Sequence, residues 1–199
     1  RAGNPATYEL EVRASPGNVS SVEHILYSEG EDRRETNYLV AVKLGPNSTP
    51  QQIELGLAAV DTSLNSVRVC DFSDTEQLAH LEAVLVQVGP REVLLPQSDH
   101  AVVKKIRETV ERNRILVTQR PTKDFSPLSE PEVARLVAPK ECQEPVRACP
   151  LASGALHCVT EYLGLQEGAM LHVEVLVQGE TMRLDPRAVA GLNLLPNPG

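Results

Sequence analysis

Three apolar segments follow one another closely: YLVAVKL at residues 38–44, IELGLAAV at 53–60 and SVRVCDF at 66–72. Aliphatic and β-branched residues dominate all three, and such segments favour strands. The spacers between them are too short for a crossover helix, and GPNSTP at 45–50 is typical of a turn. The sequence therefore predicts three strands that are joined as antiparallel hairpins.

Helical and strand patterns alternate after these segments. Asp74 is expected to cap the first helix, and either Ser98 or Asp99 is expected to cap the second. The predicted order is a helix at about 74–88, a strand at 92–95, a helix to about 112, a strand at 114–118 and a helix at 130–137. Three antiparallel strands that feed two right-handed crossover units form a mixed α/β sheet with helices on its faces. This is the strand order of the ribonuclease-H-like fold.

The segments on either side of the predicted sheet carry weaker patterns. Residues 8–13 alternate like a strand, and Ser20 is expected to cap a short helix that reaches Leu26. PKECQEPVRACP at 139–150 has three prolines and is predicted to be a linker.

The sequence after this linker contains a helical pattern at 153–163, an apolar alternation at 171–177 and a helix start at Asp185-Pro186. It has too few apolar positions for a core of its own. We therefore predict a domain boundary between residues 148 and 149, and expect residues 149–199 to pack on parts of a longer protein.

Composition excludes several classes of protein. The 199 residues carry a net charge of −8, which disfavours direct binding of nucleic acid by this chain alone. One stretch is basic, and we interpret it as the solvated face of a helix rather than a binding patch; it contains Lys104, Lys105, Arg107, Arg112 and Arg114. No signal peptide opens the chain, and no apolar run is long enough for a membrane span.

The four cysteines are Cys70, Cys142, Cys149 and Cys158. They form no close C-x-x-C pair and do not supply a zinc site, so we expect reduced, partly buried thiols, as in the cytosol or nucleus. Two N-x-S/T sequons, which begin at Asn18 and Asn47, leave a secreted binding module as a weaker alternative.

A set of short phrases occurs in a fixed order: ASPGN at 14–18, VD at 60–61, CDF at 70–72, LEAVLVQVGPRE at 81–92, DFS at 124–126, and LD, AV and LNL between 184 and 194. Together they resemble the MutS family of DNA mismatch-repair proteins, most closely the group of second eukaryotic MutS homologues. The resemblance implies that residues 1–148 are the connector domain, with a ribonuclease-H-like fold, and that residues 149–199 begin the lever and core domain.

The resemblance also implies a function. The connector joins the mismatch-reading domain to the levers and the ATPase, and offers a docking surface to MutL homologues. The implied partners are a second MutS homologue in a heterodimer, a MutL homologue and, through the full-length protein, mismatched duplex DNA in the nucleus. No G-x-x-x-x-G-K-[ST] occurs, so we expect no cofactor here, with ATP and Mg²⁺ bound in the ATPase domain of the parent protein.

An active ribonuclease-H-like nuclease is the alternative. Such enzymes hold divalent metals with an Asp in the middle of the first strand, a Glu on the first helix and an Asp at the end of the fourth strand. Here the first strand has Lys43 and no acid, the fourth is followed by Pro96, and only Glu76 or Glu82 could imitate the helix position. We therefore predict no catalytic, cofactor-binding or metal-binding residue.

Few isolated residues invite a functional interpretation. Asp61 ends an apolar strand, and we favour a turn in which its side chain bonds nearby backbone N–H groups. His157 beside Cys158 could suggest a nucleophile pair, but adjacent helical residues do not face each other. The loops at 97–100 and 122–126 are candidate partner contacts.

Overall fold

The computed structural model describes residues 38–49, 51–61, 64–165 and 171–176. The strand predicted at 8–13, the helix predicted from Ser20 and the helix start predicted at Asp185 lie outside these ranges.

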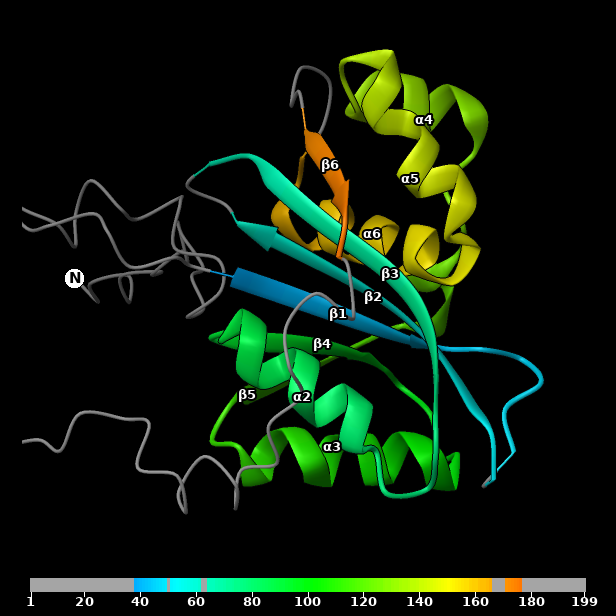
Figure 1. Ribbon diagram of the computed structural model, residues 1–199, viewed down its shortest axis with the longest axis vertical. Helices are drawn as coiled ribbons and strands as arrows, with labels where there is room; N and C mark the ends of the chain where they lie inside the picture. Colours follow the sequence, from blue (N-terminus) through cyan, green and yellow to red (C-terminus); the bar gives the residue numbers. More distant parts are fainter. Residues whose placement is uncertain (1–37, 50, 62–63, 166–170, 177–199) are drawn as a thin grey trace, which may run out of the picture.

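The described chain folds around one mixed sheet of six strands in the order β5-β4-β1-β2-β3-β6 (Figure 1). β1 pairs antiparallel with β2, and β2 pairs antiparallel with β3. β4 and β5 add in parallel beyond β1, and β6 adds in parallel beyond β3. The strands are Tyr38–Leu44, Ile53–Asp61, Ser66–Asp74, Glu92–Pro96, Leu116–Arg120 and His172–Val175. The first five strands confirm the predicted ribonuclease-H-like order, and β6 extends it.

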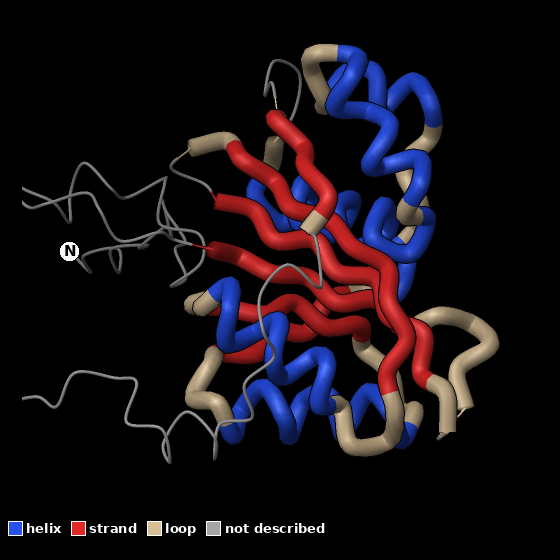
Figure 2. The backbone as a smooth tube through the Cα atoms, viewed as in Figure 1, coloured by secondary structure: helices blue, strands red, loops and turns tan. Residues whose placement is uncertain are grey.

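Helices cover both faces of this sheet (Figure 2). α2 (Ala79–Val88) and α3 (Ala101–Arg112) lie on one face, and α6 (Pro150–Leu163) crosses the other. The chain between β5 and α6 forms η1 (Thr122–Phe125), α4 (Glu130–Leu136), η2 (Lys140–Cys142) and α5 (Gln143–Ala148).

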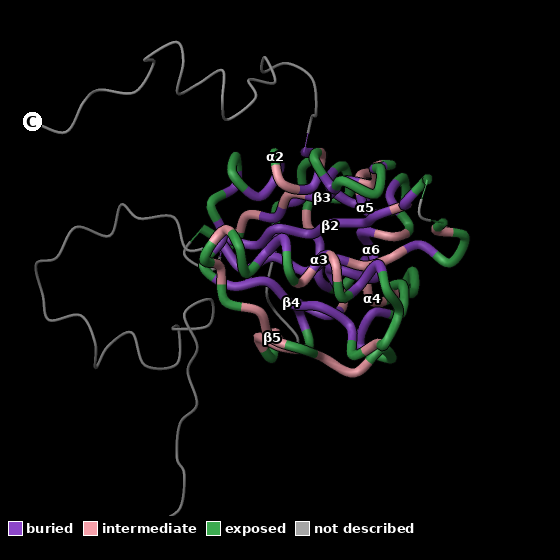
Figure 3. Tube along the Cα trace, turned by 90° about the horizontal axis from the view of Figure 1, so that it is seen from below, coloured by how far each residue is buried: buried purple, intermediate pink, exposed green. Residues whose placement is uncertain are grey.

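Each face of the sheet has its own hydrophobic core. Leu39 and Ala41 of β1 belong to the core under α6, whereas Val40 and Val42 belong to the core under α2 and α3. Successive side chains of a strand point to opposite faces, so a strand that is covered on both sides is apolar throughout. This explains the continuous apolar runs of β1 and β2, which are buried along most of their length (Figure 3).

The first helix begins later than predicted. Asp74 is the last residue of β3, and a turn separates it from the start of α2 at Ala79. The predicted capping side chain is nevertheless used, because one Asp74 oxygen accepts the backbone N–H of Leu81 at 2.7 Å. The helix starts later because Leu78, directly before it, has a left-handed backbone conformation with φ of 53°. The side chain of Leu78 is fully buried in the core.

The cap predicted for the second helix was wrong. His100 is the N-cap of α3, and its Nδ1 accepts the backbone N–H of Val102 at 3.3 Å. Ser98 instead accepts the N–H of His100. A histidine does not belong to the preferred capping residues, so the sequence favoured its neighbours.

The linker predicted at 139–150 was also wrong. This segment forms η2 and α5, and Cys142, Val146 and Cys149 are buried from it. The prolines do not prevent helix formation here, because Pro150 occupies the first turn of α6, where no intrahelical N–H is required.

The chain after residue 148 packs on the same sheet as the chain before it. Ala152, Ala155 and Leu156 of α6 share a core with Leu39 and Ala41 of β1, and β6 pairs with β3. The predicted boundary at 148/149 therefore does not coincide with a change of packing, and α6 finds its hydrophobic partners within this chain.

Candidate functional site

The positions at which a ribonuclease-H-like nuclease carries its acids are occupied differently here. Ala41 lies in the middle of β1 and is fully buried, and Pro96 ends β4. Glu82 on α2 accepts hydrogen bonds from Arg112 and Asn113 of the neighbouring helix. Within the described residues, no three His, Cys, Asp or Glu side chains are grouped so that they could hold a metal ion.

A polar row crosses the sheet on the α6 face. Lys43 of β1, Gly56 of β2 and Asp71 of β3 are neighbours in the strand register. Asp71 accepts the backbone N–H groups of Leu151 at 3.0 Å and Ala152 at 2.7 Å. These N–H groups lie in the first turn of α6 and have no partner within the helix, so Asp71 satisfies them as a capping side chain would.

Lys43 completes this row. Partial burial lowers the pKa of its ammonium group, and the charge of Asp71 acts in the opposite direction. The carboxylate of Asp71 thus holds α6 on the sheet, with the ammonium group of Lys43 beside it in the same row.

Gly56 allows the helix to approach the sheet. A Cβ atom at this position would lie 2.3 Å from the backbone N of Ala152. The first turn of α6 therefore rests directly on the backbone of β2, which only glycine permits.

A second polar cluster holds the other end of α6. Glu92 of β4 is fully buried and accepts hydrogen bonds from the hydroxyls of Thr118 at 2.6 Å and Tyr162 at 2.9 Å. The guanidinium of Arg120 lies 5.5 Å from the centre of the Tyr162 ring and pairs with Asp124 at 2.8 Å. The cluster joins β4, β5, η1 and α6, so its acids are engaged in structural contacts.

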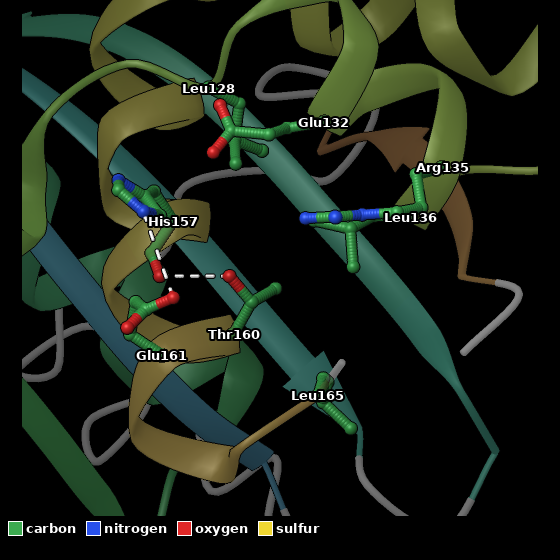
Figure 4. Close-up of a pocket in the computed structure, with 8 residues that line it drawn as sticks. All are labelled: Leu128, Glu132, Arg135, Leu136, His157, Thr160, Glu161 and Leu165. Atoms are coloured by element: carbon green, nitrogen blue, oxygen red, sulfur yellow. Dashed lines mark hydrogen bonds and ion pairs between the residues drawn. The ribbon is translucent and has the colours of Figure 1, made fainter. Parts of the chain in front are cut away.

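A surface hollow of about 470 Å³ lies between α4 and α6 (Figure 4). We call it the α4–α6 groove. Leu128, Leu136 and Leu165 supply its apolar lining, and the remaining lining residues are Glu132, Arg135, His157, Thr160 and Glu161. It therefore combines three leucines with charges of both signs on a mainly polar surface.

The polar walls of the α4–α6 groove are held in place by local contacts. One ring nitrogen of His157 lies 2.8 Å from the carbonyl of Ser126, and the other lies 4.0 Å from Glu161. Glu132 accepts hydrogen bonds from the hydroxyl and from the backbone N–H of Ser129, and these bonds hold its pKa below the usual range. Arg135 is exposed and extends from α4 into the groove.

His157 and Cys158 do not form a pair. His157 faces the α4–α6 groove, whereas Cys158 is fully buried in the core, where burial raises the pKa of its thiol to about 12. The basic stretch is engaged in ion pairs along an exposed helix face: Lys104 with Asp99, Lys105 with Glu76 and Arg112 with Glu82.

Of the remaining sequence candidates, the loop at 97–100 is largely exposed, whereas Asp61 and part of the loop at 122–126 are buried. Asp61 is fully buried as the last residue of β2, and the residues of its predicted turn, 62–63, lie outside the described ranges. The loop at 122–126 contains η1, in which Asp124 and Phe125 are buried, so only part of it could contact a partner.

Sequence reasoning missed the contact of Asp71 with α6 and that of Cys142 with His172. Both join segments that are far apart in the chain, by 81 residues from Asp71 to Ala152 and by 30 from Cys142 to His172. No local pattern of helix or strand residues signals such pairs.

A sequence profile of the family described as MutS domain II matches residues 37–173, which is most of the described chain. The chain belongs to the MutS family. The matched part is the connector domain of this family of DNA mismatch-repair proteins, and it includes α6 and part of β6.

Curated MutS relatives match almost the whole chain. The Drosophila melanogaster mismatch-repair protein spellchecker 1 is 31% identical over 98% of this chain and 22% of its own length. The protein MSH2 of Arabidopsis thaliana is 27% identical over 97% of this chain and 21% of its own length. The protein MSH2 of Saccharomyces cerevisiae is 27% identical over 95% of this chain and 20% of its own length. The chain thus spans about a fifth of the length of the curated relatives that it matches.

Solved structures with a similar backbone include a fowlpox virus resolvase bound to Holliday junction DNA. It is 9% identical, with a TM-score of 0.40, over 64% of this chain and 99% of its own. The Thermus thermophilus RuvC protein in complex with a Holliday junction substrate is 11% identical, with a TM-score of 0.36. The match covers 65% of this chain and 98% of the RuvC chain. Among the described residues, no helix has the length and hydropathy that crossing a bilayer requires.

Proposed function

We propose that this chain is the non-catalytic connector of a eukaryotic mismatch-repair MutS protein, and that it couples the mismatch-binding region to the ATPase. The observation that carries this proposal is the contact of Asp71 with the first turn of α6. An acid of the sheet is thereby used to hold a helix.

Coupling requires a domain that moves as one body. α6 is fixed to the sheet near both ends, at its start by Asp71 and near its end by the hydrogen bond from Tyr162 to Glu92. Its apolar face fills the core between these two contacts. A movement of the levers at one border of such a unit would reach the opposite border as a rigid-body displacement.

We further propose that the α4–α6 groove docks a MutL homologue. The groove places three leucines beside charges of both signs, and the exposed Arg135, a residue type enriched at protein interfaces, extends into it. The basic face of α3 is a weaker candidate, because three of its four cations are already paired.

The remaining proposals concern the whole parent protein. It would form a heterodimer with a second MutS homologue, bind mismatched duplex DNA and act in the nucleus. ATP and Mg²⁺ would bind in its ATPase domain, since this chain has no P-loop sequence. The connector unit would extend through β6, with the lever and core domain beginning beyond it.

Coupling can be tested in the full-length protein with Asp71→Ala combined with Tyr162→Phe. We expect mismatch binding and basal ATP hydrolysis to persist, while the acceleration of nucleotide exchange by mismatched DNA falls several-fold. Asp99→Ala, which removes an exposed acid, is the matched control. Full coupling in the double variant would contradict the proposal.

Docking is tested separately with Arg135→Glu. We expect weaker capture of the full-length protein by an immobilised MutL homologue, with unchanged mismatch binding. Lys104→Glu makes the same change of charge on α3 and should leave capture intact. Equal loss of capture in both variants would refute the assignment of docking to the α4–α6 groove.

A further inference from the structure

Cys142, His172 and Glu174 form a chain of contacts at the edge of the sheet. The Sγ atom of Cys142 lies 3.3 Å from Nδ1 of His172. The other ring nitrogen, Nε2, lies 3.4 Å from a carboxylate oxygen of Glu174. The three side chains are therefore connected in the order thiol, imidazole, carboxylate.

The backbone brings these residues together. Leu171 donates its N–H to the carbonyl of Leu136 at 2.9 Å and accepts the N–H of Ala138 at 3.3 Å. These bonds fix the start of β6 against the end of α4, so the following η2 helix lies beside β6. His172 and Glu174 are two residues apart and so share one side of β6, while Val173 between them enters the core.

The order of the three groups is that of an activated nucleophile. A base within hydrogen-bond reach takes the proton of the nucleophile, and a third group orients the base. With its proton on Nε2 and directed at Glu174, the His172 ring leaves Nδ1 free to accept the thiol proton. This tautomer follows from the partners of the two nitrogens.

We infer that Cys142, His172 and Glu174 form a reactive thiol site at which Cys142 is modified by peroxides and other small electrophiles. His172 takes the thiol proton, and Glu174 stabilises the imidazolium that results. The site is independent of the connector role and uses neither Asp71 nor Glu92, the two acids that hold the ends of α6.

Access to this site favours small reagents. The side chains of His172 and Glu174 are 57% and 58% exposed, whereas Cys142 is only 7% exposed. The thiol thus lies at the edge of the core behind an exposed imidazole. We therefore expect modification by small reagents rather than by a folded protein or an extended peptide.

With hydrogen peroxide as the oxidant, the chemistry balances. The Cys142 proton passes to Nδ1 of His172, and the thiolate attacks one peroxide oxygen. An S–O bond forms while the O–O bond breaks, and the departing hydroxide takes the proton from the imidazolium and leaves as water. The sulfur loses two electrons and becomes sulfenic acid, and the peroxide is reduced.

Two other thiols of the chain provide internal controls. Burial raises the pKa of Cys149 and of Cys158, so both remain protonated at neutral pH. The charged side chains on the elements packed around Cys142, besides His172 and Glu174, are Lys140 and Glu141 on η2, Glu144 and Arg147 on α5, Glu130, Glu132 and Arg135 on α4, and Arg68, Asp71 and Asp74 on β3. Of these, Arg147 is bound to Glu130 and Gln143.

The test is the alkylation rate of each cysteine in the full 199-residue chain with iodoacetamide, followed by peptide mass spectrometry. At about pH 7 we expect Cys142 to react about ten-fold faster than Cys149 or Cys158. His172→Gln should lower the Cys142 rate about ten-fold at that pH, and the deficit should vanish near pH 10, where a thiol ionises without a base. A deficit that persists at high pH would indicate lost access and would overturn the inference.

A second variant, at Glu174, tests the proposed site without changing His172. Glu174→Gln should lower the Cys142 rate at neutral pH by a smaller factor, whereas Glu144→Gln, which removes an exposed acid from α5, should not. The rates of Cys149 and Cys158 report on folding in every variant, because unfolding would raise them. Treatment with hydrogen peroxide and dimedone should label Cys142 before the other cysteines. Equal rates at all four cysteines, or no effect of either β6 variant, would refute the site.

Discussion

The carboxylate of Asp71 accepts a hydrogen bond from the backbone N–H of Ala152, 81 residues later in the chain, at 2.7 Å. This single contact joins a central strand of the sheet to the first turn of the helix that crosses it. It also engages one of the acids that the sheet carries.

Removal of this acid should destabilise the domain. Asp71→Ala leaves two N–H groups of α6 without their acceptor, and we expect a loss of about 1–2 kcal/mol in the free energy of unfolding. Asp71→Asn keeps one acceptor oxygen and should lose less. Urea denaturation measures both, with Asp99→Ala as the control on an exposed acid. No loss in Asp71→Ala would mean that the contact does not hold α6.

Gly56→Ala should be more damaging. The added methyl group would lie 2.3 Å from the backbone N of Ala152, so α6 must move away from β2. We expect a loss of about 3 kcal/mol, as for overpacked cores. Gly89→Ala is the comparison, because its Cβ meets open space and only the positive φ of 62° opposes it, at a cost of about 1 kcal/mol. Equal losses in a denaturant titration would contradict the close approach of α6.

The two hydroxyls that reach Glu92 should act together. Tyr162→Phe and Thr118→Val each remove one donor to the same buried carboxylate oxygen, and each should cost about 1 kcal/mol. In the double variant this oxygen loses both donors, so the loss should exceed the sum of the single losses by about 0.5 kcal/mol or more. A double-mutant cycle measured by denaturation gives this difference. Strict additivity would show that the two hydrogen bonds are independent.

Cys158 should make stability fall in alkaline solution. Burial raises the pKa of its thiol from 9.0 to about 12, so the folded chain holds this proton more tightly than the unfolded chain does. The stabilisation is complete below about pH 9 and is lost as the pH rises toward about 12.

Lys43 has the opposite effect on the pH dependence of stability. Its pKa is lowered from 10.5 in the folded chain, so its contribution to stability rises as the pH rises. The effect of Cys158 is therefore read as a difference between proteins. Unfolding free energies of the natural chain and of Cys158→Ala should converge as the pH rises from 8 to 10 or beyond. A constant difference would argue against a buried, protonated thiol.

Sequence reasoning succeeded where local patterns are strong. The apolar runs at 38–44 and 53–60, the helix at 130–137 and the mixed sheet all follow from periodicity and turn residues. It failed where tertiary packing overrode a local preference. The prolines at 139–150 suggested a linker, yet Cys142, Val146 and Cys149 are buried there and stabilise two short helices.

The candidate sites were harder to predict than the fold. The absence of an acid from YLVAVKL could be read directly from the sequence. The use of Asp71 by α6, and the meeting of Cys142 with His172, could not, because they depend on how α6 and β6 return to the sheet. Likewise, the α4–α6 groove is formed by residues from two separate helices and the loops beside them.

The central claim is that a sheet of the nuclease type serves here as a rigid connector, with its acids engaged in holding α6. Incubation of the purified chain with an RNA–DNA hybrid and Mg²⁺ or Mn²⁺ tests it most directly. We predict no cleavage above that of a chain carrying Asp71→Asn and Glu82→Gln. Metal-dependent cleavage that this double variant abolishes would contradict the account.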